Sequence, residues 1–393
     1  MNWIKKYSNL LLVICGIIVA LIIAEIGLRL FVPTERVMSD PILGYIGNPR
    51  SGFYDSSGFR NDKVLENAEV VAIGDSQTEG NNAPVPSEAW PQVLGKLAGK
   101  SVYQLAVGGD GPIQYSYLMD KAIKLNPNLI IIGFYTGNDL MDTYYTAYSN
   151  DYWASLRDPE FKYEEKEEDT SIRLLLQNGS DADSAHISIL QFRLWLRSKS
   201  ALYTFLGRAT RGIREALGLA ETGEERNARI EKWLDGRPEL GFVYKEESIK
   251  TLLSPSYRKD SVNLSDPRTS EGWRITEKQF REMADKARIN NIEFVIAVIP
   301  TKEMVYGAYI LGNNYGISKA LNEYVGMETD LKNKLFLLCK GLRIQCVDVL
   351  PGLVAKLNDK VAIYPQELDG HPIPEGYRAI AETLYKSLWG SNK

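Results

Sequence analysis

Three short groups of small and polar residues have the types and spacing that acyl transfer needs. Residues 74–80 contain Ser76, whose hydroxyl becomes an effective nucleophile only when a base removes its proton. Gly109 belongs to a glycine pair, and Asn138 lies between a glycine and an aspartate. Acyl transfer also needs hydrogen-bond donors to an oxyanion. The candidates are the backbone N–H groups of Ser76 and Gly109 and the side-chain amide of Asn138. Gly109 suits this role because it has no Cβ to block a reacting carbonyl.

The base for Ser76 must come from the two histidines of the chain. His186 lies in a polar segment, which predicts a surface residue. His371 lies in the loop before the last predicted helix. A helix in that position packs beside the first strand of an α/β sheet, so its leading loop can reach Ser76. Asp369, two residues earlier, could orient the imidazole and stabilise its charged form. These three residues predict a catalytic triad.

The three groups follow the first three of five apolar runs rich in β-branched residues, a pattern typical of strands buried on both faces. The runs are residues 69–73, 101–107, 128–135, 292–299 and 343–349. Helical periodicity is found in residues 87–98, 114–125, 275–289, 316–338 and 375–389. The alternation predicts a flavodoxin-like three-layer α/β/α sandwich with about five parallel strands. Ligands bind at the carboxyl ends of such strands, so we expect the candidate residues at one edge.

Residues from about 144 to 266 interrupt this alternation. A structureless connection of that length is unusual inside a compact domain, so we expect an inserted, mainly helical cap. Its amphipathic stretch, Ile187 to Leu217, is interpreted as packing between cap and sheet, with a substrate groove as the alternative. The acidic run Glu164 to Asp169 is interpreted as a solvated segment.

The amino-terminal residues predict a membrane anchor. Residues 7–32 are long and apolar enough to cross a bilayer. Lys5 and Lys6 precede them, so residues 1–6 are expected in the cytoplasm and the remainder outside it, on the periplasmic side. A cleaved signal peptide is the rival interpretation, but an A-x-A-like cleavage pattern is missing. Residues 33–67 are rich in turn residues and read as a lead-in to a domain formed by residues 68–393.

Composition excludes other classes of function. The formal net charge of −4 gives no basis for nucleic-acid binding. The histidines are isolated and the cysteines lack paired spacing, so neither a metal nor another cofactor is expected. The signature Gly-x-Ser-x-Gly of α/β-hydrolases fails at Thr78. Cys339 and Cys346 could form a disulfide or remain two buried thiols.

The same residues resemble the sequence blocks of the SGNH/GDSL hydrolase family, in the family's order. Residues 74–80 resemble the first block, Gly109 the second, residues 137–139 the third, and Asp369 with His371 the last. The resemblance runs from about residue 69 to the end of the chain. Two positions differ. Thr136 replaces a glycine, and Leu368 stands where the usual Asp-x-x-His block has its aspartate, although Asp-x-His occurs in acetyltransferase-like members.

The resemblance implies an activity and a setting. We expect a serine esterase that removes acyl, above all acetyl, groups from an envelope glycan or lipid through an acyl-serine intermediate. An O-acyltransferase that modifies a polysaccharide together with a polytopic polysaccharide-biosynthesis membrane protein is the second interpretation. A catalytically silent glycan-binding or assembly subunit is the third. The anchor end 24–29, the tripeptide 58–60 and residues 300–303 also resemble membrane-anchored bacterial envelope proteins of this group.

Overall fold

The structure is a computed structural model that describes residues 2–32, 35–163, 196, 199–219 and 221–390. His186, the acidic run 164–169 and most of residues 187–198 lie outside the described residues. The expectations for them therefore stay predictions.

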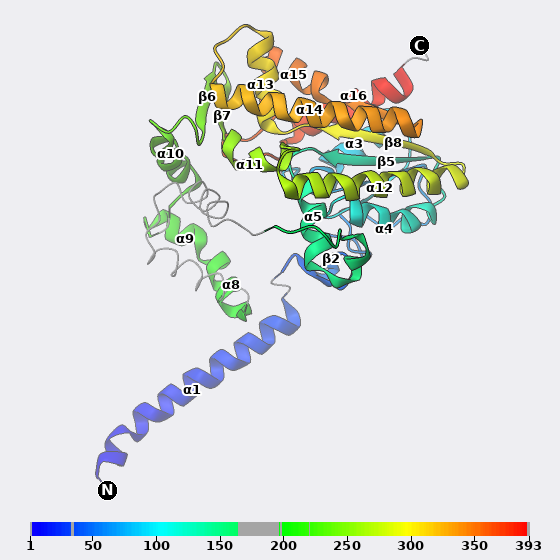
Figure 1. The fold of residues 1–393 in the computed structure, drawn as a ribbon. Helices are drawn as coiled ribbons and strands as arrows, with labels where there is room; N and C mark the ends of the chain where they lie inside the picture. Colours follow the sequence, from blue (N-terminus) through cyan, green and yellow to red (C-terminus); the bar gives the residue numbers. More distant parts are fainter. Residues whose placement is uncertain (1, 33–34, 164–195, 197–198, 220, 391–393) are drawn as a thin grey trace.

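A five-stranded parallel sheet with the order β4-β3-β5-β8-β9 forms the centre of the molecule (Figure 1). Its strands are β3 (Val70–Gly74), β4 (Val102–Ala106), β5 (Leu129–Tyr135), β8 (Glu293–Ile299) and β9 (Gln345–Asp348). Counted along the chain within this sheet, the order is 2-1-3-4-5, which is the flavodoxin-like order. The predicted fold class is confirmed, and all five predicted runs contain a strand.

Two layers of helices cover the sheet because successive strand residues point to opposite faces. Val70 and Ala72 face one hydrophobic cluster, whereas Val71 and Ile73 face the other. The first cluster is completed by α3 (Trp90–Ala98), α13 (Lys302–Gly312), α15 (Leu350–Asn358) and α16 (Pro374–Trp389). The second is completed by α4 (Pro112–Ile123), α5 (Asp139–Ser149), α12 (Pro267–Ile289) and most of α14 (Lys319–Leu342). Helices α5, α13 and α15 lie outside the five predicted helical ranges.

The lead-in segment packs onto the domain through a hairpin and a buried arginine. Strands β1 (Val37–Asp40) and β2 (Gly44–Gly47) pair in antiparallel fashion. Phe59 belongs to the second hydrophobic cluster, and the buried Arg60 guanidinium donates to the backbone carbonyls of Gly80 and Ala83. The lead-in therefore supports the loop that follows Ser76.

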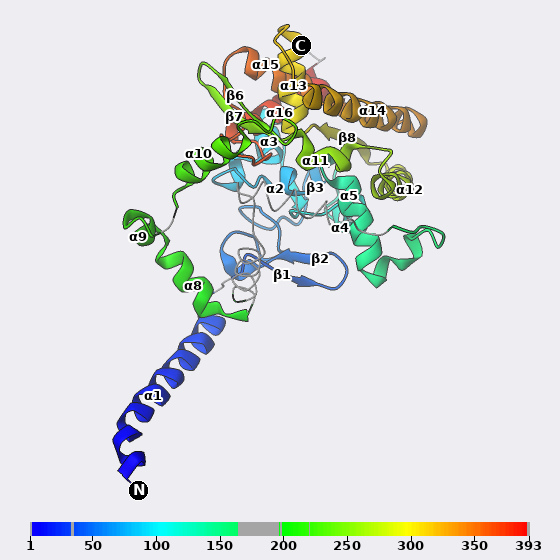
Figure 2. The same cartoon turned by 60° about the vertical axis from the view of Figure 1, so that its left-hand side comes forward.

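The long connection between β5 and β8 contains helices and a hairpin (Figure 2). Its described elements after residue 199 are α8 (Ala201–Ala209), α9 (Arg211–Ala216), α10 (Gly223–Leu234), β6 (Phe242–Glu246), β7 (Ile249–Leu253) and α11 (Pro255–Val262). The hairpin of β6 and β7 was not predicted, and it is an addition to an insertion whose described elements are mainly helical. It forms because Ile249, Leu252 and Leu253 are buried against the first cluster and α10.

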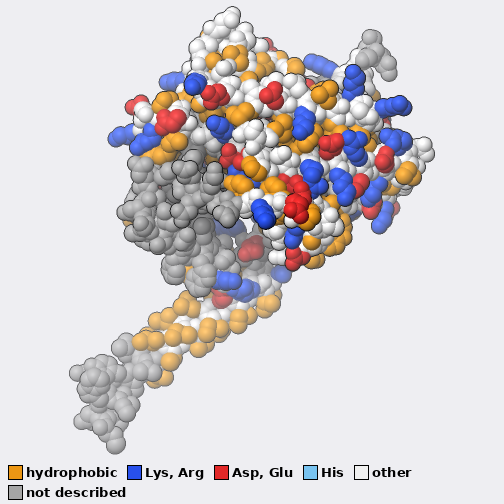
Figure 3. Space-filling view, viewed as in Figure 1, with side chains coloured by type: hydrophobic (Ala, Val, Ile, Leu, Met, Phe, Trp, Pro, Cys, Tyr) orange, Lys and Arg blue, Asp and Glu red, His pale blue; other side chains and the backbone are white. Residues whose placement is uncertain are grey.

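Helix α1 (Asn2–Phe31) projects from the domain, and apolar side chains line it in Figure 3. Its segment Leu12–Phe31 has a mean hydropathy of 2.5 and is long and apolar enough to cross a membrane. Among the described residues no other helix meets that test. At the far side of the domain, Cys339 of α14 and Cys346 of β9 form a disulfide, which resolves the two alternatives for this pair.

Candidate active site

The structure brings the three predicted triad residues into one line of contacts. Ser76 is the first residue of helix α2 (Ser76–Glu79), directly after β3. Its Oγ lies 2.8 Å from Nε2 of His371, whose Nδ1 lies 2.5 Å from Oδ1 of Asp369. The backbone N–H of His371 donates to the same carboxylate oxygen at 3.0 Å. In this geometry the imidazole can take the hydroxyl proton, and the carboxylate orients the imidazole.

A tight strand-to-helix turn presents Ser76. Asp75 caps α2 by accepting the backbone N–H of Gln77 at 2.8 Å. The Ser76 hydroxyl also lies 3.3 Å from Oδ2 of Asp75. Burial raises the pKa of Asp75 to about 6, against the opposing effect of the Gln77 hydrogen bond. The contacts of Asp75 give it a structural role at the helix start.

The loop that carries His371 is held by side chains from the nucleophile side. Asn82 Nδ2 donates to Asp369 Oδ2 at 2.9 Å and to the His371 carbonyl at 3.0 Å. Gln77 Nε2 donates to the Gly370 carbonyl at 3.3 Å. Burial opposes ionisation of Asp369, but the hydrogen bonds from His371 and Asn82 hold its pKa below the usual range. The carboxylate is therefore kept charged beside the imidazole.

The one-residue difference from the usual last block has a structural explanation. Leu368, which stands at the usual aspartate position, packs on a small cluster formed by the insertion, including Trp233 and Leu252. Asp369 occupies the place beside His371 Nδ1 instead.

The three predicted oxyanion donors are free to receive a ligand. Within the described part of the chain, the backbone N–H groups of Ser76 and Gly109 donate to no acceptor, and the Asn138 amide makes no hydrogen bond. Asn138 begins α5 without capping it. A Cβ placed on neighbouring Gly108 would lie 3.3 Å from Ser76 Cβ, so the glycine turn adjoins the nucleophile. Strands β4 and β5 flank β3, which puts the two donor loops on either side of Ser76.

Gly109 is required for a reason that the sequence did not reveal. Its φ is +83°, a conformation that favours glycine. The Tyr45 hydroxyl occupies the place that a Cβ would take and donates to the Gly108 carbonyl. The lead-in hairpin therefore contributes a side chain to this edge of the site.

Two cations near the His371 loop were not assigned a role from the sequence. Arg258 of α11 donates to the Gly137 carbonyl at 3.3 Å, and a Cβ on Gly370 would lie 3.3 Å from its Nη2. Lys302 Nζ donates to Thr251 at 3.2 Å and to the Glu367 carbonyl at 2.7 Å. These bonds join the insertion to the loops that carry Asn138 and His371. Arg258 stands in no motif, and the resemblance of residues 300–303 gave Lys302 no role, so only the fold reveals the contacts.

Burial lowers the pKa of Lys302 to about 8. Arg258 lies 5.4 Å over the Tyr135 ring and forms no ion pair with a carboxylate among the residues described. Both side chains act on the site through backbone carbonyls and are positioning residues.

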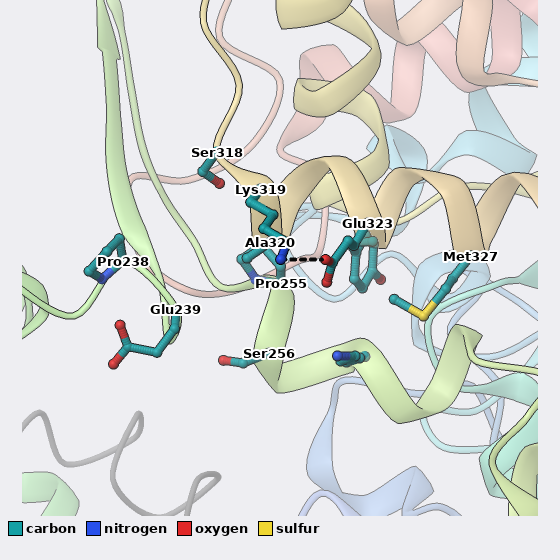
Figure 4. Close-up of a pocket in the computed structure, with 11 residues that line it drawn as sticks. Pro238, Glu239, Pro255, Ser256, Ser318, Lys319, Ala320, Glu323 and Met327 are labelled. Atoms are coloured by element: carbon teal, nitrogen blue, oxygen red, sulfur yellow. Dashed lines mark ion pairs between the residues drawn. The ribbon is translucent and has the colours of Figure 1, made fainter.

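A separate cavity of about 440 Å³ lies between the insertion and the start of α14 (Figure 4). Its labelled residues include Glu239, Ser256, and the ion pair of Lys319 with Glu323, 3.7 Å long. None of the triad or oxyanion residues lines it. The cavity is therefore distinct from the site around Ser76, although α11 contributes to both.

No protein-family model matches the chain, and no curated protein matches it. Solved structures with some likeness include a protein assigned as an acylhydrolase from Bacteroides fragilis, TesA, and a GDSL-like lipase from Bacteroides thetaiotaomicron. Each is 12% identical over 82% of this chain and over 88%, 98% and 88% of its own, in that order. Their TM-scores are 0.32, 0.35 and 0.32. A likeness this weak carries no argument, so the fold is defined by its strand order and connections.

Proposed function

We propose that this chain is a membrane-tethered serine esterase of the SGNH/GDSL type that removes acyl groups, acetyl above all, from an envelope glycan or lipid. The observation that carries the proposal is the unbroken line of contacts from the Ser76 hydroxyl through His371 to Asp369. The resemblance of four sequence blocks to that family supports it. The assembled line of contacts weighs against a catalytically silent subunit.

Acylation uses the atoms already in contact. His371 Nε2 takes the hydroxyl proton while Ser76 Oγ attacks the carbonyl carbon of the ester. The carbonyl oxygen becomes an oxyanion, toward which the N–H groups of Ser76 and Gly109 and the Asn138 amide would donate. The imidazolium, stabilised by Asp369, then gives the proton to the departing alcohol oxygen as the C–O bond breaks. The acyl group remains on Ser76.

Deacylation repeats these steps with water. His371 takes a proton from water, the new hydroxyl attacks the acyl carbon, and the Ser76 Oγ leaves with the proton from His371. The products are a carboxylic acid and the free serine. A sugar hydroxyl in place of water would make the chain an O-acyltransferase. That alternative is favoured by the Asp-x-His spacing shared with acetyltransferase-like members, and one membrane span would then require a polytopic partner to deliver the acyl donor.

The setting of the proposed reaction is the outer side of the cytoplasmic membrane. Helix α1 is long and apolar enough to be an anchor, and Lys5 and Lys6 lie before its apolar segment. The positive-inside tendency then puts the domain outside the cytoplasm.

Detergent-solubilised full-length protein tests the chemistry. We expect a fluorophosphonate to label Ser76 and the protein to hydrolyse p-nitrophenyl acetate, with Ser76→Ala as the unlabelled control. A wild-type protein that is neither labelled nor active would overturn the enzymatic proposal. Turnover that rises strongly with an added oligosaccharide, giving acylated sugar, would identify a transferase.

A further inference from the structure

The end of α1 is joined to α8 by hydrogen bonds to one carboxylate. Glu25 accepts from the Ser200 hydroxyl and from the backbone N–H groups of Ala201 and Leu202, each at 2.9 Å. Arg29 donates to the Lys199 carbonyl. The first N–H groups of a helix lack partners within it and favour a negative charge, so Glu25 caps α8. Figures 1 and 2 both place α8 beside the domain-proximal end of α1.

Helices α8 and α9 carry one continuous apolar stripe. Thr210 links them, donating to the Leu206 carbonyl at 3.0 Å and accepting from the Arg214 N–H at 2.9 Å. Apolar residues recur at intervals of three and four on one side of the pair, as an amphipathic helix requires. They are Leu202, Phe205, Leu206, Ala209, Ile213, Ala216 and Leu217.

This stripe faces outward. Phe205, Leu206, Ile213 and Leu217 are 41%, 48%, 61% and 67% exposed. On the opposite side, Thr204 is partly buried, whereas Arg208 and Arg211 are exposed. A helix that served as packing between cap and sheet would show the reverse arrangement. The interpretation of this stretch as cap-to-sheet packing is therefore wrong for its described part, because α8 packs on α1 and not on the sheet.

Two further features indicate which surroundings suit the stripe. Residues 199–219 contain four cations, Lys199, Arg208, Arg211 and Arg214, and the single carboxylate Glu215. Between α1 and α8 lies a groove of about 500 Å³ lined by apolar side chains of α1 and α8, by the cation Lys199, and by Glu25, whose charge is paired with Arg29. An apolar groove with cations beside it is complementary to acyl chains that end in anionic headgroups.

We propose that α8 and α9 lie in the interface of the bilayer that α1 crosses, with the apolar stripe among the upper acyl chains and the arginines among anionic headgroups. The inference rests on the anchor role given to α1 in the proposed function. We assign lipid as the partner of the stripe for two reasons. The stripe begins beside the domain-proximal end of α1, where the proposed anchor leaves the bilayer, and cations outnumber carboxylates around it. Helices α8 and α9 would then hold the insertion at the membrane surface. Helix α11 of the active site belongs to the same insertion.

Nitroxide accessibility in reconstituted full-length protein tests this placement. In a Cys15→Ser background, spin labels are placed one at a time through Ile213→Cys, Leu217→Cys and, as the matched control on the polar side, Arg211→Cys. The vesicles contain phosphatidylethanolamine and phosphatidylglycerol. Oxygen partitions into lipid, whereas nickel-EDDA stays in water. We expect oxygen to exceed nickel-EDDA several-fold at positions 213 and 217, and the reverse at position 211.

Equal nickel-EDDA access at positions 211, 213 and 217 would overturn the inference. Shielding of position 213 from both reagents would overturn it as well, because it would show that protein covers the stripe. A label introduced by Ile18→Cys tests separately whether α1 lies in the bilayer. Lipid exposure at position 18 with water exposure at position 213 leaves the anchor intact, whereas water exposure at both sites removes the anchor too. Fluorophosphonate labelling of Ser76 in the same vesicles reports independently on the esterase.

Discussion

The nucleophile loop, residues 74–82, and the base loop, residues 367–371, each hold a catalytic side chain in position, but different interactions stabilise them. The nucleophile loop is fixed mainly by local structure, because β3 ends at Gly74 and the Asp75 side chain caps the helix that starts at Ser76, and Arg60 adds a bond to the Gly80 carbonyl. The base loop has no regular structure and is held by hydrogen bonds from elsewhere, chiefly Asn82 and Lys302. A loop of this second kind can be loosened without unfolding the domain.

The pKa values of the carboxylates in the two loops shift in opposite directions. Burial raises the pKa of Asp75 to about 6, because only a few donors compensate for the loss of water. Burial acts on Asp369 in the same direction, but hydrogen bonds from His371 and Asn82 prevail and lower its pKa. Donors from His371 and Asn82, together with the partial exposure of Asp369, therefore keep its pKa low, whereas Asp75 is fully buried. Four experiments test the difference between the two loops.

Removing the acting group of either loop should have the largest effect. Ser76→Ala and His371→Ala should each lower kcat by roughly 10⁶-fold, and the double variant should be no worse, because the two groups act as a unit. Ester hydrolysis by the purified full-length protein measures the loss, and circular dichroism checks the fold. Additive losses in the double variant would show that the residues act separately.

The two carboxylates should then differ strongly. Asp369→Asn should lower kcat by about 10⁴-fold, since an amide favours the wrong imidazole tautomer. Asp75→Asn is the matched control and should cost no more than about tenfold, because asparagine also caps helices and one modest hydrogen bond is weakened. Steady-state kinetics of both variants measures the two losses in kcat. Near wild-type activity of Asp369→Asn would reject its assigned role.

Loosening the base loop should have an intermediate effect. Asn82→Ala removes donors to the Asp369 carboxylate and the His371 carbonyl, and should lower kcat/KM by roughly 10- to 100-fold, as for hydrogen bonds to charged groups. Because His371 still holds the pKa of Asp369 below its usual range, the loss should appear in kcat/KM at every assay pH, with the shape of the pH–rate profile unchanged. Wild-type kcat/KM together with a lower thermal stability would indicate a purely structural role.

The last effect should be seen in stability against pH and not in catalysis. The folded-state pKa of Asp75, about 6, lies above its ordinary value of 3.8, so the folded protein binds more protons between these pH values. Stability from this group is therefore present below pH 3.8 and lost as the pH rises to about 6. Wild type should lose about 3 kcal/mol relative to Asp75→Asn across that window. Urea unfolding at several pH values measures it, and parallel curves would contradict the assignment.

Much of the site could be predicted because its signals are local. Strands were found from β-branched runs, and the residues directly after them, Ser76, Gly109 and Asn138, follow from the rule that ligands bind at strand ends. Other contributors carry no local signal. Asn82 looks like any turn residue, and its value comes from a contact with Asp369, 287 positions away. The hairpin of β6 and β7 was missed because its strands are short and only partly apolar.

Local sequence patterns are enough to predict the class of fold, the groups at the strand ends, and one serine with one candidate base, because periodicity and turn residues act over a few positions. Tertiary structure decided which carboxylate serves His371, where Leu368 packs, how Arg258 and Lys302 reach the catalytic loops, and which way the stripe of α8 and α9 faces. Those outcomes depend on which distant segments become neighbours. That is set by the packing of the whole chain and not by any stretch of it alone.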